Sequence, residues 1–201
     1  MIQALKIASK FAHGRAILPL TRGWERVRVK GQFVDVAAAI GQFRDRMAAY
    51  MLKAIKEAKQ NTSWTEPNPE YESATKTFVE AVLDPSKRKF LDDFVEFQAK
   101  VSFFGRLNSL SQVLLKITSP GVPDFYQGTE LWDLNLVDPD NRRPVDYALR
   151  ERLLSELDRK AEAGNLPALC AELLENYQDG RIKLWTTMQA LRLRRDRRDL
   201  R

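Results

Sequence analysis

The stretch Ser119-Pro-Gly-Val-Pro-Asp-Phe-Tyr-Gln-Gly-Thr-Glu-Leu-Trp132, followed by Asp138-Pro-Asp-Asn-Arg-Arg-Pro-Val-Asp146, is the most informative part of this chain. Its beginning predicts a turn at residues 119–121 and a short buried strand over residues 122–126. A long loop then runs over residues 127–144. Loops longer than about 15 residues are usually functional or disordered. The apolar residues inside this loop favour an ordered, functional segment.

The polar groups of the loop suit recognition of a sugar. Carboxylates, amides and guanidinium forks satisfy hydroxyl groups, and the rings of Tyr126 and Trp132 match the flat apolar faces of a pyranose. The alternative is structural, because Asp138-Pro-Asp-Asn can form a capped turn that Arg142 fixes through ion pairs. Glycoside chemistry uses two carboxyl groups on opposite sides of the scissile bond, but spacing alone identifies neither a nucleophile nor an acid. The carboxylates of this region are Asp124, Glu130, Asp133, Asp138, Asp140 and Asp146.

Helical periodicity dominates most of the remaining sequence. Breaks at Asp84-Pro85, Gly164-Asn165 and Asp179-Gly180 separate the expected helices. The phenylalanines of the third helix and the thiol of Cys170 are expected in the core. Two short strands or irregular segments are expected near residues 15–20 and 27–36. The expected helices cover residues 36–60, 71–83, 87–117, 145–163, 166–177 and 181–195.

Composition limits the possible classes of protein. With 201 residues, 44% hydrophobic and 30% charged, the chain is long enough for a folded domain with a core. No apolar run reaches the roughly 18 residues that span a bilayer, so no membrane partner is expected. A single cysteine cannot form an internal disulfide, which favours a cytoplasmic protein. His13 is the one histidine, which argues against a multi-histidine metal site, and no cofactor is expected.

The net charge of +6 raises the question of a nucleic-acid partner. The excess positive charge is concentrated at the C-terminal end, where a patch for phosphate groups is one interpretation. A solvated helix end, whose dipole favours cations, is the other. The lack of interleaved aromatic residues favours the helix end and argues against nucleic acid as a partner. The arginines concerned are Arg192, Arg194, Arg195, Arg197, Arg198 and Arg201.

A second polar cluster occupies residues 56–64, where a helix is expected to end. It contains Lys56, Lys59 and Trp64. A sugar or an anion is one candidate ligand, and a basic helix C-terminus with an anchoring indole is the structural alternative.

The quoted stretch resembles the signature of the malto-oligosyltrehalose synthases, a family within the alpha-amylase superfamily. The signature joins Pro-Gly-Val-Pro-Asp-X-Tyr-Gln-Gly-X-Glu to Asp-Pro-Asp-Asn-Arg-Arg-Pro-Val-Asp-Tyr. Further similar segments lie at residues 50–59, 62–64, 107–116 and 179–185. The resemblance covers about residues 43–198 in the family's order, which leaves residues 1–42 as an unmatched N-terminal segment and residues 43–201 as a partial barrel domain.

The resemblance implies a (β/α)8 barrel with its site at the C-terminal ends of the strands. The chain as it stands is then expected to be mainly α, with a few short strands, as the C-terminal part of that barrel, and residues 122–126 are expected to be the eighth strand. The implied reaction is an intramolecular transglucosylation, which turns the reducing-end α-1,4 bond of a malto-oligosaccharide into an α,α-1,1 trehalosyl end.

One departure from the family concerns catalysis. The family's third catalytic acid lies in a His-Asp motif, which this sequence lacks. The chain is therefore expected to be a late segment without catalytic residues, inactive and marginally stable alone, with the missing part of the enzyme as a partner. A helical protein-interaction module and a basic nucleic-acid-binding fragment are the alternatives. The resemblance gives these candidate substrate-binding residues: Lys59, Trp64, Tyr126, Gln127, Glu130, Asp140, Asn141 and Arg142.

Overall fold

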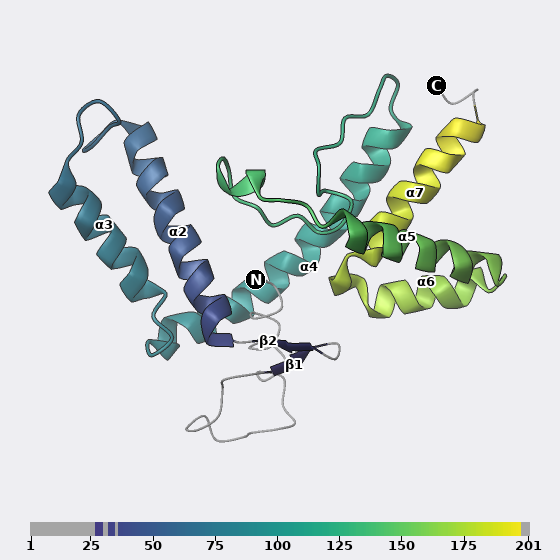
Figure 1. Cartoon of the computed structure of the whole chain (residues 1–201), viewed down its shortest axis with the longest axis horizontal. Helices are drawn as coiled ribbons and strands as arrows, with labels where there is room; N and C mark the ends of the chain where they lie inside the picture. The colour runs from purple at the N-terminus through teal and green to yellow at the C-terminus, as the bar shows by residue number, and fades with distance from the viewer. Residues whose placement is uncertain (1–26, 30–31, 35, 198–201) are drawn as a thin grey trace. The chain divides into compact units, whose positions relative to one another are not determined.

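The computed structural model describes residues 27–29, 32–34 and 36–197, and these form mainly α-helices (Figure 1). His13, Arg198, Arg201 and the possible strand near residues 15–20 lie outside the described residues. The elements in chain order are β1 (Val27–Val29), β2 (Gln32–Val34), α2 (Val36–Ala58), α3 (Pro69–Val82), α4 (Arg88–Thr118), η1 (Asp140–Arg142), α5 (Tyr147–Glu162), α6 (Leu166–Glu175), η2 (Tyr177–Asp179) and α7 (Arg181–Asp196).

The helix positions agree with those expected from the periodicity, and side-chain caps explain several starts. Asn68 accepts a hydrogen bond from Tyr71 N at 3.1 Å, Asp146 from Leu149 N at 2.9 Å, and Asn165 from Ala168 N at 3.1 Å. Each cap satisfies a backbone N–H that has no partner inside its helix. The prediction of a mainly helical chain is therefore confirmed. None of the described helices combines the length and apolar character that a bilayer crossing requires.

The chain divides into two compact units, Met1–Val101 and Ser102–Arg201. In the first unit β1 and β2 form an antiparallel hairpin in which Val27 pairs with Val34. The helices α2 and α3 lie side by side (Figure 1), with Ala48 and Val79 buried. The boundary predicted near residue 43 marks where the resemblance to the family begins, which is a different property from the division into compact units. That boundary stays a prediction.

The second unit has two small cores. In the first, Leu157 of α5 packs with Leu169 and Leu173 of α6 and with Leu184 of α7. Because full burial of one leucine contributes about 1.5–3 kcal/mol, this cluster holds the three helices together.

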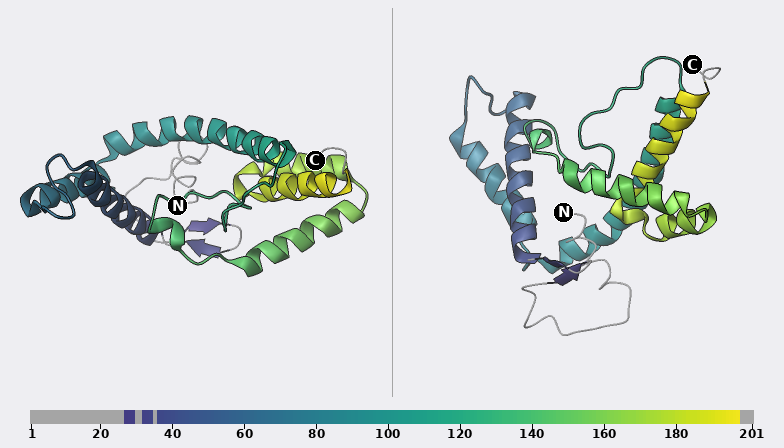
Figure 2. Two further views of the ribbon diagram at one scale, coloured as in Figure 1. Left: turned by 90° about the horizontal axis from the view of Figure 1, so that it is seen from above. Right: turned by 45° about the vertical axis from the view of Figure 1, so that its right-hand side comes forward.

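The second core of this unit joins α4 to α7. Val113 and Ile117 of α4 pack with Ala190 of α7, and Phe125 covers them. Figure 2 shows α7 lying along the C-terminal part of α4. The residues just before the candidate loop, which include Phe125, therefore pack on α4 and α7.

The structure corrects two expectations about the core. Phe97 and Phe104 of α4 are 65% and 62% exposed, and Phe90 is also exposed. Their side of α4 carries no covering element among the described residues. Cys170 is exposed rather than buried, because α6 turns Leu169 and Leu173 toward the core instead.

A third correction concerns the strand predicted over residues 122–126, since these residues have no assigned strand structure. Strands are stable only when other strands pair with them. Among the described residues, the pairing strands are β1 and β2, which pair with each other.

Candidate functional site

The first half of the candidate loop is organised by Arg150 of α5. Its Nε atom lies 2.7 Å from Glu130 Oε2, its Nη2 donates to Gly128 O at 2.8 Å, and its Nη1 donates to Asp146 O at 3.0 Å. Gly128 has a φ of 90°, and a Cβ there would lie 3.3 Å from Val145 Cγ2, so glycine suits this position. One guanidinium group thus binds the backbone near the start of the loop, at Gly128, the backbone just after its end, at Asp146, and the carboxylate of Glu130.

The middle of the loop is attached to the connection between α6 and α7. Trp132 Nε1 donates to Tyr177 O at 2.7 Å. Gly180, with a φ of 88°, brings the backbone so close that an added Cβ would lie 3.2 Å from Trp132 N. Lys183 Nζ donates to Leu131 O at 3.2 Å and lies 5.8 Å from the centroid of the Trp132 ring. The loop is therefore held by side chains that are distant in sequence.

Lys183 is a buried ammonium group beside this loop, only 7% exposed. Burial lowers its pKa, because a charged group is less stable away from water. The carboxylates of Asp133 and Glu130 act in the opposite direction, whereas the ammonium of Lys116 adds to the lowering. Lys183 thus places a positive charge under a loop that is rich in carboxylates.

The second half of the loop is closed by its own polar groups. Leu136 N donates to Asp140 Oδ2 at 2.7 Å, and Arg143 Nε donates to Asp140 O at 3.0 Å. Arg142 Nε forms an ion pair with Asp138 Oδ1. The structural role considered for Asp140 and Arg142 therefore exists in the molecule, and it leaves their role toward a sugar as a prediction.

Two candidate residues at the start of the loop present their side chains to solvent. Tyr126 is 48% exposed, and Gln127 is also exposed. Farther along, Asn141 Oδ1 is buried and receives no hydrogen bond from any described residue. An amide oxygen without a donor is costly to bury, so this atom has the capacity to accept a hydrogen bond from a ligand.

The remaining candidates, Lys59 and Trp64, belong to the first unit and follow α2. The Trp64 indole is 61% exposed, and Lys56 Nζ lies 4.9 Å from the centroid of its ring. Lys56 Nζ also lies 3.0 Å from Glu72 Oε2. Lys59 is exposed and has a φ of 54°, which is uncommon outside glycine. Such a conformation just after a helix is also typical of a helix C-terminus.

The turn after Lys59 is held by a buried hydroxyl group. Thr62 Oγ1 donates to Glu72 Oε1 at 2.6 Å and accepts from Asn68 N at 3.0 Å. The hydrogen bond from Thr62 and the neighbouring Lys56 ammonium lower the pKa of Glu72. These contacts define the backbone that presents Trp64 to solvent.

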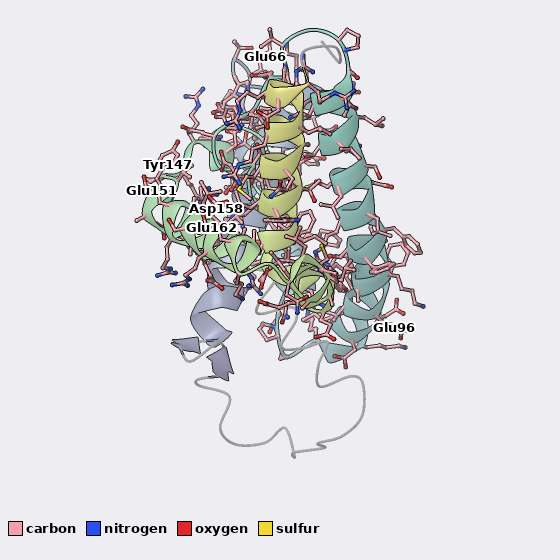
Figure 3. The ribbon with its side chains drawn as sticks, turned by 90° about the vertical axis from the view of Figure 1, so that its right-hand side faces the viewer. Glu66, Glu96, Tyr147, Glu151, Asp158 and Glu162 are labelled. Atoms are coloured by element: carbon pink, nitrogen blue, oxygen red, sulfur yellow. The ribbon has the colours of Figure 1, made fainter. Side chains whose placement is uncertain are left out.

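Arginines of the C-terminal end bind groups within the second unit. Arg192 forms two hydrogen bonds with Asp158, at 2.7 and 2.9 Å. Figure 3 labels Asp158 on α5, close to α7. Arg194 donates to the carbonyl groups of Ile117, Ser119 and Gly121, at 2.7 Å for Ser119 O. These contacts favour the helix-end interpretation over a phosphate patch, because two of the cations are already paired.

Comparisons with known proteins add independent evidence. No model of a protein family matches the chain. A putative maltooligosyl trehalose synthase of Mycobacterium tuberculosis (strain CDC 1551 / Oshkosh) is 39% identical over 162 residues, which are 75% of this chain and 20% of that protein. A crystal structure of a maltooligosyl trehalose synthase is 40% identical, with a TM-score of 0.66, over 79% of this chain and 20% of that one. The chain is similar in sequence and in structure to part of a maltooligosyl trehalose synthase.

The maltooligosyltrehalose synthase from Arthrobacter ramosus gives the same result. It is 39% identical, with a TM-score of 0.59, over 81% of this chain and 20% of that one. The chain thus spans about a fifth of the length of the maltooligosyl trehalose synthases that it matches. The resemblance inferred from the quoted stretch is confirmed.

Sequence reasoning about the maltooligosyl trehalose synthase motifs missed Arg150 and Lys183 as organising residues of the site. Arg150 lies 20 residues from Glu130, and Lys183 lies 52 residues from Leu131. A faint signal existed for Lys183, which lies within the matched segment 179–185. Nothing in the local pattern linked either cation to the loop.

Proposed function

We propose that this chain supplies part of the substrate site of an enzyme that rearranges malto-oligosaccharides. The enzyme converts the reducing-end α-1,4 bond into an α,α-1,1 trehalosyl end by intramolecular transglucosylation. The observation that carries the proposal is 39–40% identity to maltooligosyl trehalose synthases over three quarters of the chain or more. That homology favours an enzyme segment over a helical interaction module or a nucleic-acid-binding fragment.

The reaction exchanges one glycosidic bond for another. An enzyme carboxylate takes up the glucan as the bond to the reducing-end glucose breaks, and a proton from a general acid goes to the departing hydroxyl. The released glucose turns, and its anomeric hydroxyl attacks the glucan carbon and loses a proton. Water must be kept away during this step, since hydrolysis competes with the transfer. In this proposal the catalytic acids come from polypeptide that matches the other four fifths of the relatives.

Residues at the start of the loop contact the sugar in this proposal. The exposed ring of Tyr126 offers a flat apolar surface, and Gln127 offers a donor and an acceptor. Glu130 accepts a hydrogen bond from a sugar hydroxyl. Its carboxylate is held in place by Arg150, whose Nε lies 2.7 Å from Glu130 Oε2. Fixing a carboxylate before binding reduces the entropy that binding costs.

Residues after the loop's midpoint add further proposed contacts, and the first unit has candidates of its own. Asn141 Oδ1 accepts a hydrogen bond from a sugar hydroxyl, which gives this buried oxygen a partner. Arg142 and Asp140 contribute hydrogen bonds to a sugar as well as to the loop. The exposed Trp64 ring and the ammonium of Lys59 act on the reducing-end glucose. The proposal includes a (β/α)8 barrel, to which residues 43–201 contribute, and the cytoplasmic location predicted from the sequence.

Binding of maltopentaose to the chain tests the proposal. Isothermal titration calorimetry and chemical-shift changes in NMR spectra would measure the affinity. We expect weak binding that is lost in Tyr126→Ala and in Arg142→Ala, whereas Tyr126→Phe keeps the ring and most of the affinity. Binding that both alanine variants leave unchanged would show that the sugar, if bound, lies elsewhere on the chain.

A further inference from the structure

Lys183 occupies a position that stability alone does not favour. It lies in the first turn of α7, where the helix dipole disfavours a positive charge. Its side chain is 7% exposed, and burial of an ammonium group costs free energy unless a carboxylate pairs with it. Lys183 forms no ion pair with any described carboxylate, whereas Arg181 in the same turn pairs with two. An apolar side chain at this position would avoid these costs.

The contacts of this ammonium group are with the candidate loop. Lys183 Nζ donates to Leu131 O at 3.2 Å and lies 5.8 Å from the centroid of the Trp132 ring. A cation within about 6 Å of an indole ring is attracted to the ring. One buried charge therefore contacts two successive residues, and these directly follow Glu130, a candidate sugar-binding residue. Local rules that a residue breaks are often broken for function, and here the function concerns the loop.

Trp132 is held by α7 and by the residues just before that helix. Its Nε1 donates to Tyr177 O at 2.7 Å, and an added Cβ at Gly180 would lie 3.2 Å from its backbone N. These two contacts involve no charge, and both remain when the side chain of Lys183 is changed. The contribution of the ammonium group to the placement of Trp132 can therefore be removed separately from the other two.

The surroundings of Lys183 decide how easily it loses its proton. Burial has the largest effect and lowers the pKa of Lys183 below its usual value of 10.5. Two nearby carboxylates oppose this effect, and a second ammonium group adds to it. The charged and titratable groups that face Lys183 or its contacts are Asp133 and Glu130 of the loop, Lys116 of α4, Arg150 of α5 and Tyr177 of η2.

We propose that Lys183 is a positioning residue of the sugar site, and that its ammonium group holds Leu131 and Trp132 where the adjacent Glu130 can receive a malto-oligosaccharide. The proposal rests on the function proposed above, because that function supplies the sugar. It adds a requirement for a positive charge at a buried residue that does not itself touch the sugar. Sugar binding needs this charge, whereas the stability of the fold does not.

Substitution of Lys183 by methionine separates binding from stability. Methionine keeps an apolar stem but has no charge and no donor, so the affinity for maltopentaose should fall by about tenfold or more. The melting temperature should stay the same or rise, because the variant buries no ammonium group. Lys183→Arg keeps the charge, and its affinity should stay within about threefold of the original. A methionine variant that binds as well as the original, or that melts well below it, would overturn the proposal.

The pH dependence of maltopentaose binding tests the charge in the unmodified chain. Deprotonation removes the ammonium group, so the affinity should fall as the pH rises through the pKa of Lys183, below 10.5. Lys116→Met removes a repelling cation and should move this fall to higher pH, whereas Asp133→Asn should move it to lower pH. The same midpoint in all three proteins would assign the fall to another group and overturn the proposal.

The indole N–H of Trp132 reports on the loop without any sugar. It donates to Tyr177 O, and the variant Trp132→Phe identifies its signal in ¹H–¹⁵N NMR spectra. In Lys183→Met, exchange of this proton with solvent should become about tenfold faster. The indole of Trp185, which packs against the leucine core, should be unaffected. Unchanged exchange at Trp132, or an equal increase at Trp185, would contradict a specific effect on the loop.

The positioning role and the proposed function fail in different ways. Maltopentaose that binds the original chain and Lys183→Met equally would retain the function and reject the role of Lys183. No binding to the original chain, together with faster indole exchange in Lys183→Met, would reject the sugar and retain Lys183 as the residue that holds Leu131 and Trp132.

Discussion

Arg150 Nε lies 2.7 Å from Glu130 Oε2, and this pair joins the first turn of α5 to the start of the candidate loop. The same guanidinium group also bonds two backbone carbonyls, of Gly128 and Asp146. Glu130, a candidate sugar-binding residue, is thus positioned by Arg150, which lies outside the signature that identified the loop. Removal of the Arg150 side chain should affect the loop before it affects the helices.

Substitution of Arg150 by methionine should lower the free energy of unfolding by about 1.5–3 kcal/mol, the usual size for hydrogen bonds to charged groups. Methionine keeps most of the apolar stem but loses every donor. Urea denaturation followed by circular dichroism gives the value, and Arg150→Lys, which keeps the charge, should lose less. A methionine variant as stable as the original chain would show that the three bonds contribute nothing net.

The leucine core of the second unit offers a matched pair of neighbours. Leu173 is 2% exposed and Leu174 is 64% exposed. Leu173→Ala should cost about 2–5 kcal/mol, since it leaves a cavity between α5, α6 and α7. Leu174→Ala should change stability by less than about 0.5 kcal/mol. Thermal melts of both variants measure these changes in stability. Equal decreases in melting temperature would mean that the leucine cluster of α5, α6 and α7 is packed differently.

Stability should fall in acid through the ion pairs between α5, α6 and α7. Lys160 and Arg181 hold the pKa of Glu172 below its usual value of 4.5, and Arg192 lowers that of Asp158. A carboxylate whose pKa is lowered on folding stabilises the folded state above its unfolded pKa, and this contribution is lost as the pH falls through the folded pKa. We therefore expect the melting temperature to decrease once the pH is lowered below about 4.5.

Glu172→Gln serves as the check on that pH dependence. Glutamine keeps the shape but has no charge to lose, so the variant should melt lower than the original near pH 7 and show a smaller fall in acid. High salt should reduce the difference, because these groups are partly exposed. Parallel curves for the two proteins between pH 3 and 7 would show that other carboxylates cause the fall.

Arg194 should control the turn that precedes residues 122–126. Arg194→Met removes the donors to Ser119 O and Gly121 O, and exchange of the Ser119 amide, which bonds Leu115 O at 2.9 Å, should become about tenfold faster. Arg195→Met is the control, since Arg195 is exposed and pairs with the adjacent Asp196. Faster exchange in both variants would indicate a general loosening of α7.

The helices could be predicted because their signals are local. Asn68, Asp146 and Asn165 cap helices within three residues, and the glycine and proline breaks lie where the helices end. The loop that carries most of the candidate site was also evident, because its motif is long and specific.

What the sequence did not predict depends on distant contacts. A periodic row of phenylalanines marks an apolar face, but it does not say whether this chain covers that face, and Phe97 and Phe104 are exposed. Side-chain exposure alternates along residues 122–126 as in a strand, but no strand among the described residues pairs with them. Arg150 reaches across 20 residues and Lys183 across 52, and such separations leave no trace in a local pattern.

The contact between Arg194 and Gly121 also has a consequence for synthesis on the ribosome. These residues are 73 positions apart, so Gly121 is translated long before its guanidinium partner exists. Until α7 emerges, the carbonyl groups of Ser119 and Gly121 lack their guanidinium donor, and the segment that follows is not held by it. Helix α7, which is translated after the candidate loop, therefore orients that loop, and nascent chains that stall before residue 194 would lack that orientation.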